Sequence, residues 1–177
     1  MDIQKPLVIN LIGGPGSGKS TTMAGVFYEL KKMGVNAEIV PEYAKDRVYE
    51  KAFHTLEDQT YLMSKQIHKI WRLKDEVDVI VMDASLLTTP IYDKTHDPLL
   101  KKFAINEFNK WNNLVFFIDR GDVEYKTEGR YESLTEAQAI DQHYIDICKE
   151  YHIPFDVVRN TEAVEHIVKK VVELLKK

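Results

Sequence analysis

The chain contains a single cysteine, Cys148, among its 177 residues. One thiol cannot form an internal disulfide, so an apolar core has to hold the fold together. Cys148 lies in a stretch with helical spacing, and we expect a small buried side chain there rather than a reactive thiol. The six histidines are scattered without metal-ligand spacing, which argues against a zinc site.

An excess of positive charge is also missing. The chain has 24 basic and 28 acidic residues, which gives a formal net charge of −4. Proteins that bind duplex nucleic acid usually carry a basic face or a high isoelectric point. The composition therefore argues against a duplex-binding protein, although a net charge does not exclude a local basic groove.

Long apolar runs are absent as well. No stretch is long enough to span a bilayer, and the N-terminus lacks the pattern of a signal peptide. We therefore expect a cytoplasmic protein without a membrane partner. The apolar fraction of 44% and the charged fraction of 29% are typical of a globular protein. The length predicts one domain over residues 1–177, with a sizeable core.

The chain does contain a regular alternation of strand-like and helix-like segments. Strands are expected over residues 7–12, 36–40, 78–82, 114–118 and 155–158, and helices over 19–33, 56–76, 98–111, 134–151 and 161–176. This alternation predicts an α/β fold with a mostly parallel sheet. Either Ser133 or Thr135 can cap the helix that begins at 134. The weakly patterned stretches 84–97 and 119–133 each follow a strand, so we expect loops at the carboxyl edge of the sheet, where ligands bind.

The few glycines are concentrated in one place. Four of the eight lie in the segment Gly13-Gly14-Pro15-Gly16-Ser17-Gly18-Lys19-Ser20. This segment matches the phosphate-binding pattern G-x-x-x-x-G-K-[ST] in full, with a strand-like run before it and a helical pattern after it. Backbone N–H groups must turn inward around a polyphosphate, so side chains have to be absent at the tightest points.

The residue types in this segment indicate a nucleoside triphosphate as the ligand. The glycines provide room, Pro15 stiffens the loop, and Lys19 can reach the β- and γ-phosphate oxygens. The Ser20 hydroxyl is placed to ligate Mg²⁺, and the helix that follows directs its positive end at the same anion. We therefore predict a site for ATP and Mg²⁺ formed by Gly13, Gly14, Pro15, Gly16, Ser17, Gly18, Lys19, Ser20 and Thr21.

Acidic residues that follow strand-like runs can serve the chemistry around a bound triphosphate. Asp83 ends an apolar run, where a carboxylate can hold Mg²⁺ directly or through water. Asp119 ends a similar run, but we prefer Asp83 because the third strand normally neighbours the phosphate-loop strand. Glu42 follows the second strand and can accept the proton of an attacking hydroxyl. Whether Glu42 or Asp83 is the general base stays open.

Other charged residues can act on the acceptor or on the transferred group. Asp46 and Arg47 lie just beyond the second strand and can contact the acceptor. Over about residues 119–133 the sequence predicts a lid, since Arg120 and Arg130 accompany two glycines that can act as hinges. An arginine of this kind neutralises charge on the phosphoryl group, and closure of a lid excludes water.

With these residues in view, the chain resembles the P-loop kinase superfamily, in particular its small nucleoside, nucleotide and nicotinamide-riboside kinase-like members. Compact phage and bacterial ATP-binding proteins of kinase type look most similar. The resemblance covers nearly the whole chain, but only Gly13 to Ser20 is sharply diagnostic. It implies a three-layer fold in which helices flank a five-stranded parallel sheet of strand order 2-3-1-4-5.

The resemblance also implies roles for particular residues. Pro41-Glu42 looks like the motif that supplies the general base in deoxynucleoside kinases, and Asp83-Ala84-Ser85 is similar to their acidic motif after the third strand. The stretch from Arg120 to Arg130 is similar to their lid. Ser85 departs from the pattern, which usually has an arginine at this position, so the acceptor is not identified by the resemblance.

These residues and the resemblance predict a kinase that moves the γ-phosphoryl group of ATP to a hydroxyl or phosphate of a nucleoside or nucleoside monophosphate. A variant of this hypothesis has a nucleic-acid acceptor, either a 5′-hydroxyl or a hydroxymethylated base in DNA. A P-loop ATPase or nucleotide switch is a further alternative. A module that binds without catalysis is disfavoured by the intact Lys19 and Ser20. The oligomeric state stays open, with a homodimer among the alternatives.

Overall fold

The computed structural model describes residues 6–121 and 133–176. Five parallel strands form one sheet in the order β2-β3-β1-β4-β5, which confirms the predicted topology. The strands are β1 (Leu7–Ile12), β2 (Ala37–Val40), β3 (Val79–Met82), β4 (Asn112–Asp119) and β5 (Asp156–Arg159). Because all strands run in one direction, the segments that follow them meet at the same edge of the sheet.

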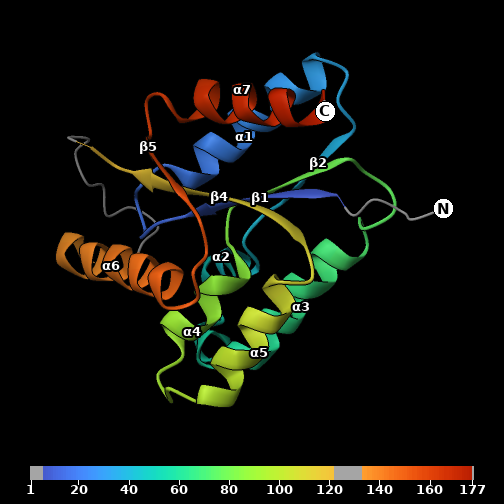
Figure 1. Cartoon of the computed structure of the whole chain (residues 1–177). Coiled ribbons are helices and arrows are strands. Elements are labelled where there is room, and N and C mark those ends of the chain that lie inside the picture. Colours follow the sequence, from blue (N-terminus) through green and yellow to red (C-terminus); the bar gives the residue numbers. More distant parts are fainter. Residues whose placement is uncertain (1–5, 122–132, 177) are drawn as a thin grey trace.

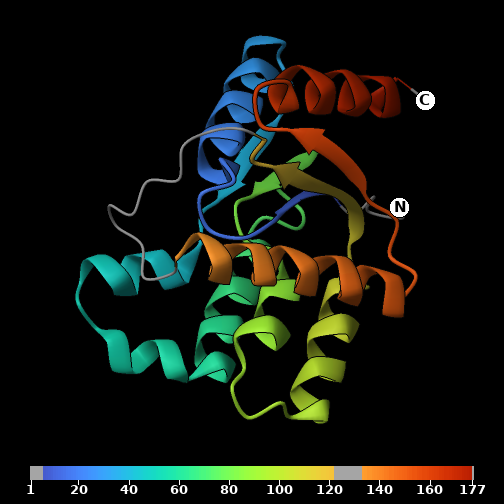
Figure 2. The same cartoon turned by 90° about the vertical axis from the view of Figure 1, so that its left-hand side faces the viewer.

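Helices cover both faces of this sheet, and Figure 1 shows α1 and α7 together on one side of it. Figure 2 shows α6 crossing the opposite face, with α2 to α5 beyond it. The helices are α1 (Lys19–Lys32), α2 (Tyr43–Tyr49), α3 (Gln59–Trp71), α4 (Thr89–Tyr92), α5 (Pro98–Phe108), α6 (Leu134–Glu150) and α7 (Ala163–Leu175). Two short 3₁₀ helices, η1 (Phe53–Glu57) and η2 (Leu86–Thr88), complete the described part of the chain.

The central strand β1 is buried on both faces, as expected for a strand inside a parallel sheet. Leu7, Ile9 and Leu11 belong to the apolar core under α1 and α7. Val8 and Ile12 belong to the second core under α3, α5 and α6. Because successive side chains of a strand point to opposite faces, β1 contributes to both cores. The two cores fix the position of β1 and of the phosphate loop that follows it.

Cys148 lies in the second core and is 1% exposed, which confirms the prediction of a small buried side chain. Burial raises the pKa of its thiol to about 11. The thiolate, which is the reactive form of cysteine, is therefore disfavoured at neutral pH.

The predicted helix over 56–76 is wrong in its extent. The helix α3 begins at Gln59, because the Asp58 carboxylate accepts a hydrogen bond from the backbone N–H of Tyr61 at 2.9 Å and acts as an N-cap. The preceding residues form the separate 3₁₀ helix η1, and α3 ends at Trp71.

The stretch 84–97, predicted as a loop, contains two short helices. Leu86 and Leu87 in η2 are 2% and 0% exposed, so this segment is anchored in the second core. Its helices are too short to show a 3.6-residue pattern, which explains why periodicity missed them. The helix α2 was missed for the same reason, since it has seven residues and none of them is buried.

The structure decides between the two proposed caps of α6. Ser133 is the N-cap, and its side chain forms a capping box with Glu136, whereas Thr135 lies inside the helix.

None of the helices that the structure describes is both long enough and apolar enough to cross a membrane.

Candidate phosphate and acceptor site

The phosphate loop joins β1 to α1 in a conformation that glycine adopts most easily. Gly13, Gly16 and Gly18 have φ angles of 138°, 79° and 96°. The Nζ atom of Lys19 donates hydrogen bonds to the carbonyl oxygens of Gly13 at 2.7 Å and Gly14 at 3.0 Å. The lysine ammonium is thereby held inside the loop, where it can meet a phosphate.

Gly14 is required by packing, because the phosphate loop lies directly against α6. A Cβ atom at this position would lie 2.3 Å from the carbonyl oxygen of Ala137. We expect Gly14→Ala to lower the free energy of unfolding by about 1–3 kcal/mol, because two backbone segments must separate. Urea denaturation measures this loss. Gly34→Asn is the control: no atom lies within 4 Å of the corresponding Cβ, and asparagine tolerates a positive φ. Equal losses in the two variants would contradict the packing explanation.

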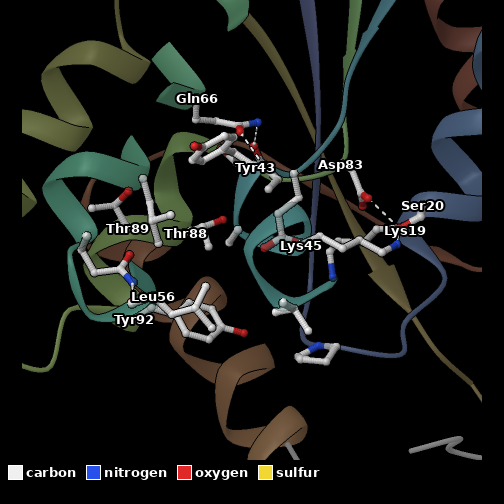
Figure 3. A pocket seen from close by; sticks show the side chains of 18 of the residues that line it. Lys19, Ser20, Tyr43, Lys45, Leu56, Gln66, Asp83, Thr88, Thr89 and Tyr92 are labelled. Carbon is white, nitrogen blue, oxygen red and sulfur yellow. Dashed lines mark hydrogen bonds between the residues drawn. The ribbon is translucent and has the colours of Figure 1, made fainter. Parts of the chain in front are cut away.

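Ser20 and Asp83 meet at the start of α1. The Ser20 hydroxyl donates to Oδ2 of Asp83 at 2.6 Å, as the dashed line in Figure 3 shows. Asp83 follows β3 and is 3% exposed. A hydroxyl and a carboxylate side by side are oxygen donors of the kind that Mg²⁺ prefers, so these residues fit the predicted metal. The sequence did not single out Lys45, whose Nζ donates to Oγ of Ser20 at 3.1 Å.

Lys19 lies in an environment that combines burial with negative charge. Burial lowers the pKa of its ammonium group, and the carboxylates of Asp83 and Glu42 oppose this shift. Both acids therefore lie within electrostatic range of Lys19, although they come from different strands. The carboxyl ends of β1, β2 and β3 bring the three residues together, as the sequence predicted.

Asp141 on α6 is a charged residue of this region that sequence reasoning missed. Its Oδ1 accepts a hydrogen bond from the backbone N–H of Gly14 at 2.5 Å, and its Oδ2 accepts one from Nη2 of Arg120 at 2.5 Å. Asp141 lies four residues after the buried Ala137 and three before the buried Tyr144. An acidic residue among the buried positions of a helix is unusual, and this pattern is the sequence signal that could have identified Asp141.

Arg120 is placed differently from the prediction. It was expected in a lid, but it is only 8% exposed and forms an ion pair with Asp141 against the phosphate loop. Its carbonyl oxygen also accepts a hydrogen bond from Nδ2 of Asn160 at 3.1 Å. The guanidinium lies there because α6 presents a carboxylate at the end of β4. The rest of the predicted lid, including Arg130, falls outside the described residues.

The pKa of Asp141 predicts how the stability depends on pH. Burial raises this pKa above its ordinary value of 3.8, while the Gly14 N–H and Arg120 oppose the shift. The folded protein therefore keeps this proton to a higher pH than the unfolded chain, so stability falls as pH rises through the window above 3.8. We expect the unfolding free energy of the wild type to decline relative to Asp141→Asn from about pH 4 upward.

The pKa of Glu136, on the same helix, is shifted in the opposite direction from that of Asp141. Hydrogen bonds from the backbone N–H and the hydroxyl of Ser133 lower the pKa of Glu136 below its ordinary value of 4.5. Its contribution is present above that value and is lost as pH falls, so the wild type should gain stability relative to Glu136→Gln as pH rises. Urea denaturation of the wild type and both variants, at pH values on either side of 3.8 and 4.5, tests these predictions. If the difference in unfolding free energy between wild type and variant changed with pH in the same direction for both variants, the directions given for the two pKa shifts would be contradicted.

A continuous cavity of about 690 Å³ extends from the phosphate loop to a second compartment beside α3, η2 and Tyr144 of α6. Figure 3 shows Lys19, Ser20 and Asp83 at one end, and Leu56, Thr89 and Tyr92 at the other. The predicted residues that line the cavity are Gly13, Pro15, Gly16, Gly18, Lys19, Ser20, Thr21, Glu42 and Asp83. Glu42 immediately precedes α2, between the two ends.

Five predicted residues of the described chain do not line this cavity, and Arg120, in its ion pair with Asp141, is one of them. Gly14 faces α6, and Ser17 is completely buried. Arg47 donates to Glu50 at 2.6 Å, and Asp46 lies 3.7 Å from Nζ of Lys69. The side chains of Asp46 and Arg47 pair with Lys69 and Glu50, so neither of them lines the cavity.

A parallel sheet of this order, with a phosphate loop after its first strand, defines a P-loop nucleoside-triphosphate-binding protein. The chain belongs to the AAA domain family, whose profile matches residues 8–165. No curated protein matches the chain. Family and fold together place it among the P-loop NTPases.

Three solved structures share this fold. The APS kinase CysC of Mycobacterium tuberculosis, as a Cys556Ala mutant, is 17% identical with a TM-score of 0.51, and the match covers 98% of this chain and 99% of that one. The deoxyadenosine kinase of M. mycoides is 19% identical with a TM-score of 0.58, covering 96% and 98%. A NadR protein, in complex with NAD and AMP-PNP, is 14% identical with a TM-score of 0.67, covering 95% of this chain and 49% of that one. Similarity at this level of identity establishes the fold alone.

Proposed function

We propose that this protein is an ATP-dependent kinase that transfers the γ-phosphoryl group to a nucleoside or nucleoside monophosphate. The observation that carries this proposal is the continuous cavity, because it joins the phosphate loop to Glu42 and to a second compartment. Its volume of about 690 Å³ lies in the range of sites for small molecules. A protein that only hydrolyses ATP does not need a compartment for a second substrate.

The donor end of the cavity would hold the triphosphate. Lys19, the loop N–H groups and the N-terminus of α1 supply positive charge to the phosphates. Ser20 and Asp83 would hold Mg²⁺, which neutralises charge on the β- and γ-oxygens when bound. Because Oδ2 of Asp83 already bonds to Ser20, we assign Asp83 to the metal and Glu42 to the proton.

The transfer itself is a displacement at phosphorus. An acceptor oxygen attacks the γ-phosphorus, and the bond to the β–γ bridging oxygen breaks, so that ADP leaves with that electron pair. Where the acceptor is a hydroxyl, Glu42 takes its proton as the new phosphorus–oxygen bond forms. Arg120, held against the phosphate loop, adds positive charge at the same edge of the sheet.

The similar structures support the proposal. Two of them are named as kinases, and the third was solved with AMP-PNP. A nucleic-acid acceptor is the second candidate for the same chemistry. The net charge of −4 does not favour it, since binding to nucleic acid usually depends on many phosphate contacts with basic residues.

The decisive experiment incubates the protein with γ-labelled ATP and Mg²⁺ against separate pools. The pools contain nucleosides, nucleoside monophosphates, nicotinamide riboside, and plain or hydroxymethylated DNA. We expect label to appear in a nucleoside or monophosphate. Label that appears only as free phosphate would favour an ATPase, and label in DNA would favour the second candidate.

A further inference from the structure

We infer that the acceptor enters the cavity as an uncharged compound, a nucleoside whose hydroxyl is phosphorylated, and not as a nucleotide or a nucleic acid. The inference rests on the proposed kinase function and narrows it to one class of acceptor. It depends on the distribution of charge along the cavity and on the side chains of the second compartment.

The charges near the point of transfer favour a neutral acceptor. The carboxylates of Glu42 and Asp83 both lie within electrostatic range of Lys19. An acceptor phosphate would bring its own negative charge next to them and to the phosphates of ATP. A hydroxyl brings no charge and gains a proton acceptor in Glu42. Like charges at close range oppose binding, so these carboxylates discriminate against a phosphorylated acceptor.

Among the positively charged side chains that line the described cavity, two lie at the end proposed for ATP, the phosphoryl donor. Nζ of Lys19 is bonded to Gly13 and Gly14, and Nζ of Lys45 is bonded to Ser20. Lys94, the third cation of the described lining, follows α4 and is exposed to solvent. The paired lysines therefore face the phosphate loop and the metal ligands.

No arginine of the described chain lines the cavity. Arg47, which comes from the helix next to Glu42, places its guanidinium 4.8 Å from the centre of the Tyr43 ring and donates to Glu50. Arginine forks are the usual partners of phosphate groups, since they bind two oxygens at once. The described lining therefore offers an acceptor phosphate no partner of this kind.

The second compartment has the chemistry of a site for a flat, uncharged ring. Leu62 and Met63 are 7% and 1% exposed, and they lie in α3 near Leu56 and Tyr92 of the lining. Apolar and aromatic walls of this kind favour a ring that stacks and is removed from water.

Neutral polar groups border this apolar wall. The Gln66 amide accepts from the backbone N–H of Tyr43 at 3.1 Å and donates to the Ala84 carbonyl at 3.3 Å, so it shapes the wall. The hydroxyls of Thr88 and Tyr144 lie 2.7 Å apart. Burial raises the pKa of Tyr144, which keeps this hydroxyl neutral. Amides and hydroxyls without charge suit the polar edge of a nucleobase.

Matched pairs of acceptors test this inference. Wild-type protein is given γ-labelled ATP and Mg²⁺ with each common nucleoside, with its own 5′-monophosphate, and with a single-stranded oligonucleotide that carries a 5′-hydroxyl. We expect kcat/KM for the preferred nucleoside to exceed that for its monophosphate by at least about 100-fold. We expect the oligonucleotide to be a poor acceptor.

A charge-reversal variant tests whether negative charge in the cavity discriminates against a phosphorylated acceptor. Beside Glu42 and Asp83, Glu57 of η1 is the third carboxylate of the described lining and is exposed, so it adds to the negative charge of the cavity. Glu57→Lys should therefore lower the ratio of kcat/KM for nucleoside over monophosphate by several-fold. Glu165→Lys on α7 is the matched control, because it changes the net charge equally outside the cavity. An unchanged ratio in Glu57→Lys, or an equal change in both variants, would contradict the electrostatic explanation.

The outcomes separate this inference from the function on which it rests. Preference for the monophosphate or for the oligonucleotide would overturn the neutral acceptor and leave the kinase in place. Failure to label any acceptor, with ATP bound or hydrolysed, would overturn the kinase and the inference together.

Discussion

Replacing Lys19 with alanine should abolish phosphoryl transfer, with a loss of at least about 10³-fold in kcat. The ammonium group of Lys19 is held in the loop by the carbonyl oxygens of Gly13 and Gly14, at 2.7 and 3.0 Å. Among the described cations of the cavity lining it is the one inside the phosphate loop, where it can neutralise charge on the transferred group, and alanine has no charge to replace it. Initial rates with γ-labelled ATP and the acceptor that the pooled assay identifies measure the loss.

The control for Lys19→Ala must separate chemistry from folding. Lys31→Ala removes an exposed lysine from the last turn of the same helix and should leave the rate unchanged. Thermal unfolding of both variants shows whether the loop lysine also supports the fold. A turnover rate in Lys19→Ala within a few-fold of the wild type would remove this residue from the mechanism.

Replacing Glu42 with glutamine should lower kcat by about 10²–10⁴-fold and leave ATP affinity nearly unchanged. Glutamine keeps the size of the side chain but cannot take a proton from the acceptor. Glu42 lines the cavity at the N-terminus of α2, within electrostatic range of Lys19. Single-turnover rates and the Kd of a fluorescent ATP analogue separate the two effects.

The matched control is Glu50→Gln, at the other end of α2 and exposed. It removes the same charge from the same helix and should leave kcat near that of the wild type. If Glu42→Gln kept a normal kcat, the proton would have to go elsewhere. Asp83 would then be the remaining carboxylate of the described residues beside the phosphate loop, in spite of its bond to Ser20.

Much of the fold was predictable because long elements carry a strong periodic signal. The alternation of strands and helices was correct, and the resemblance to P-loop kinases supplied the strand order 2-3-1-4-5 that the structure has. The errors fall on short elements. The seven residues of α2 and the four of α4 are too few for periodicity, and the cap at Asp58 divides a pattern that reads as one helix.

The sequence by itself determined the phosphate loop, because this segment is local. Its glycines, lysine and serine are contiguous, and their spacing alone dictates the backbone turn and the charge within it. The position of Glu42 and Asp83 at the cavity was also predicted from the sequence, since each follows a strand and parallel strands end at the same edge.

Only the tertiary structure decided the contacts between distant segments. Asp141 lies 127 residues after Gly14 in the sequence, and no local pattern pairs them. Packing of α6 on the carboxyl edge makes this pair and moves Arg120 from a predicted lid into a buried ion pair. Packing of the helices also forms the apolar compartment behind Glu42. The phosphate loop therefore follows from local chemistry, whereas the proposed acceptor site depends on how helices pack, which spacing along the chain does not specify.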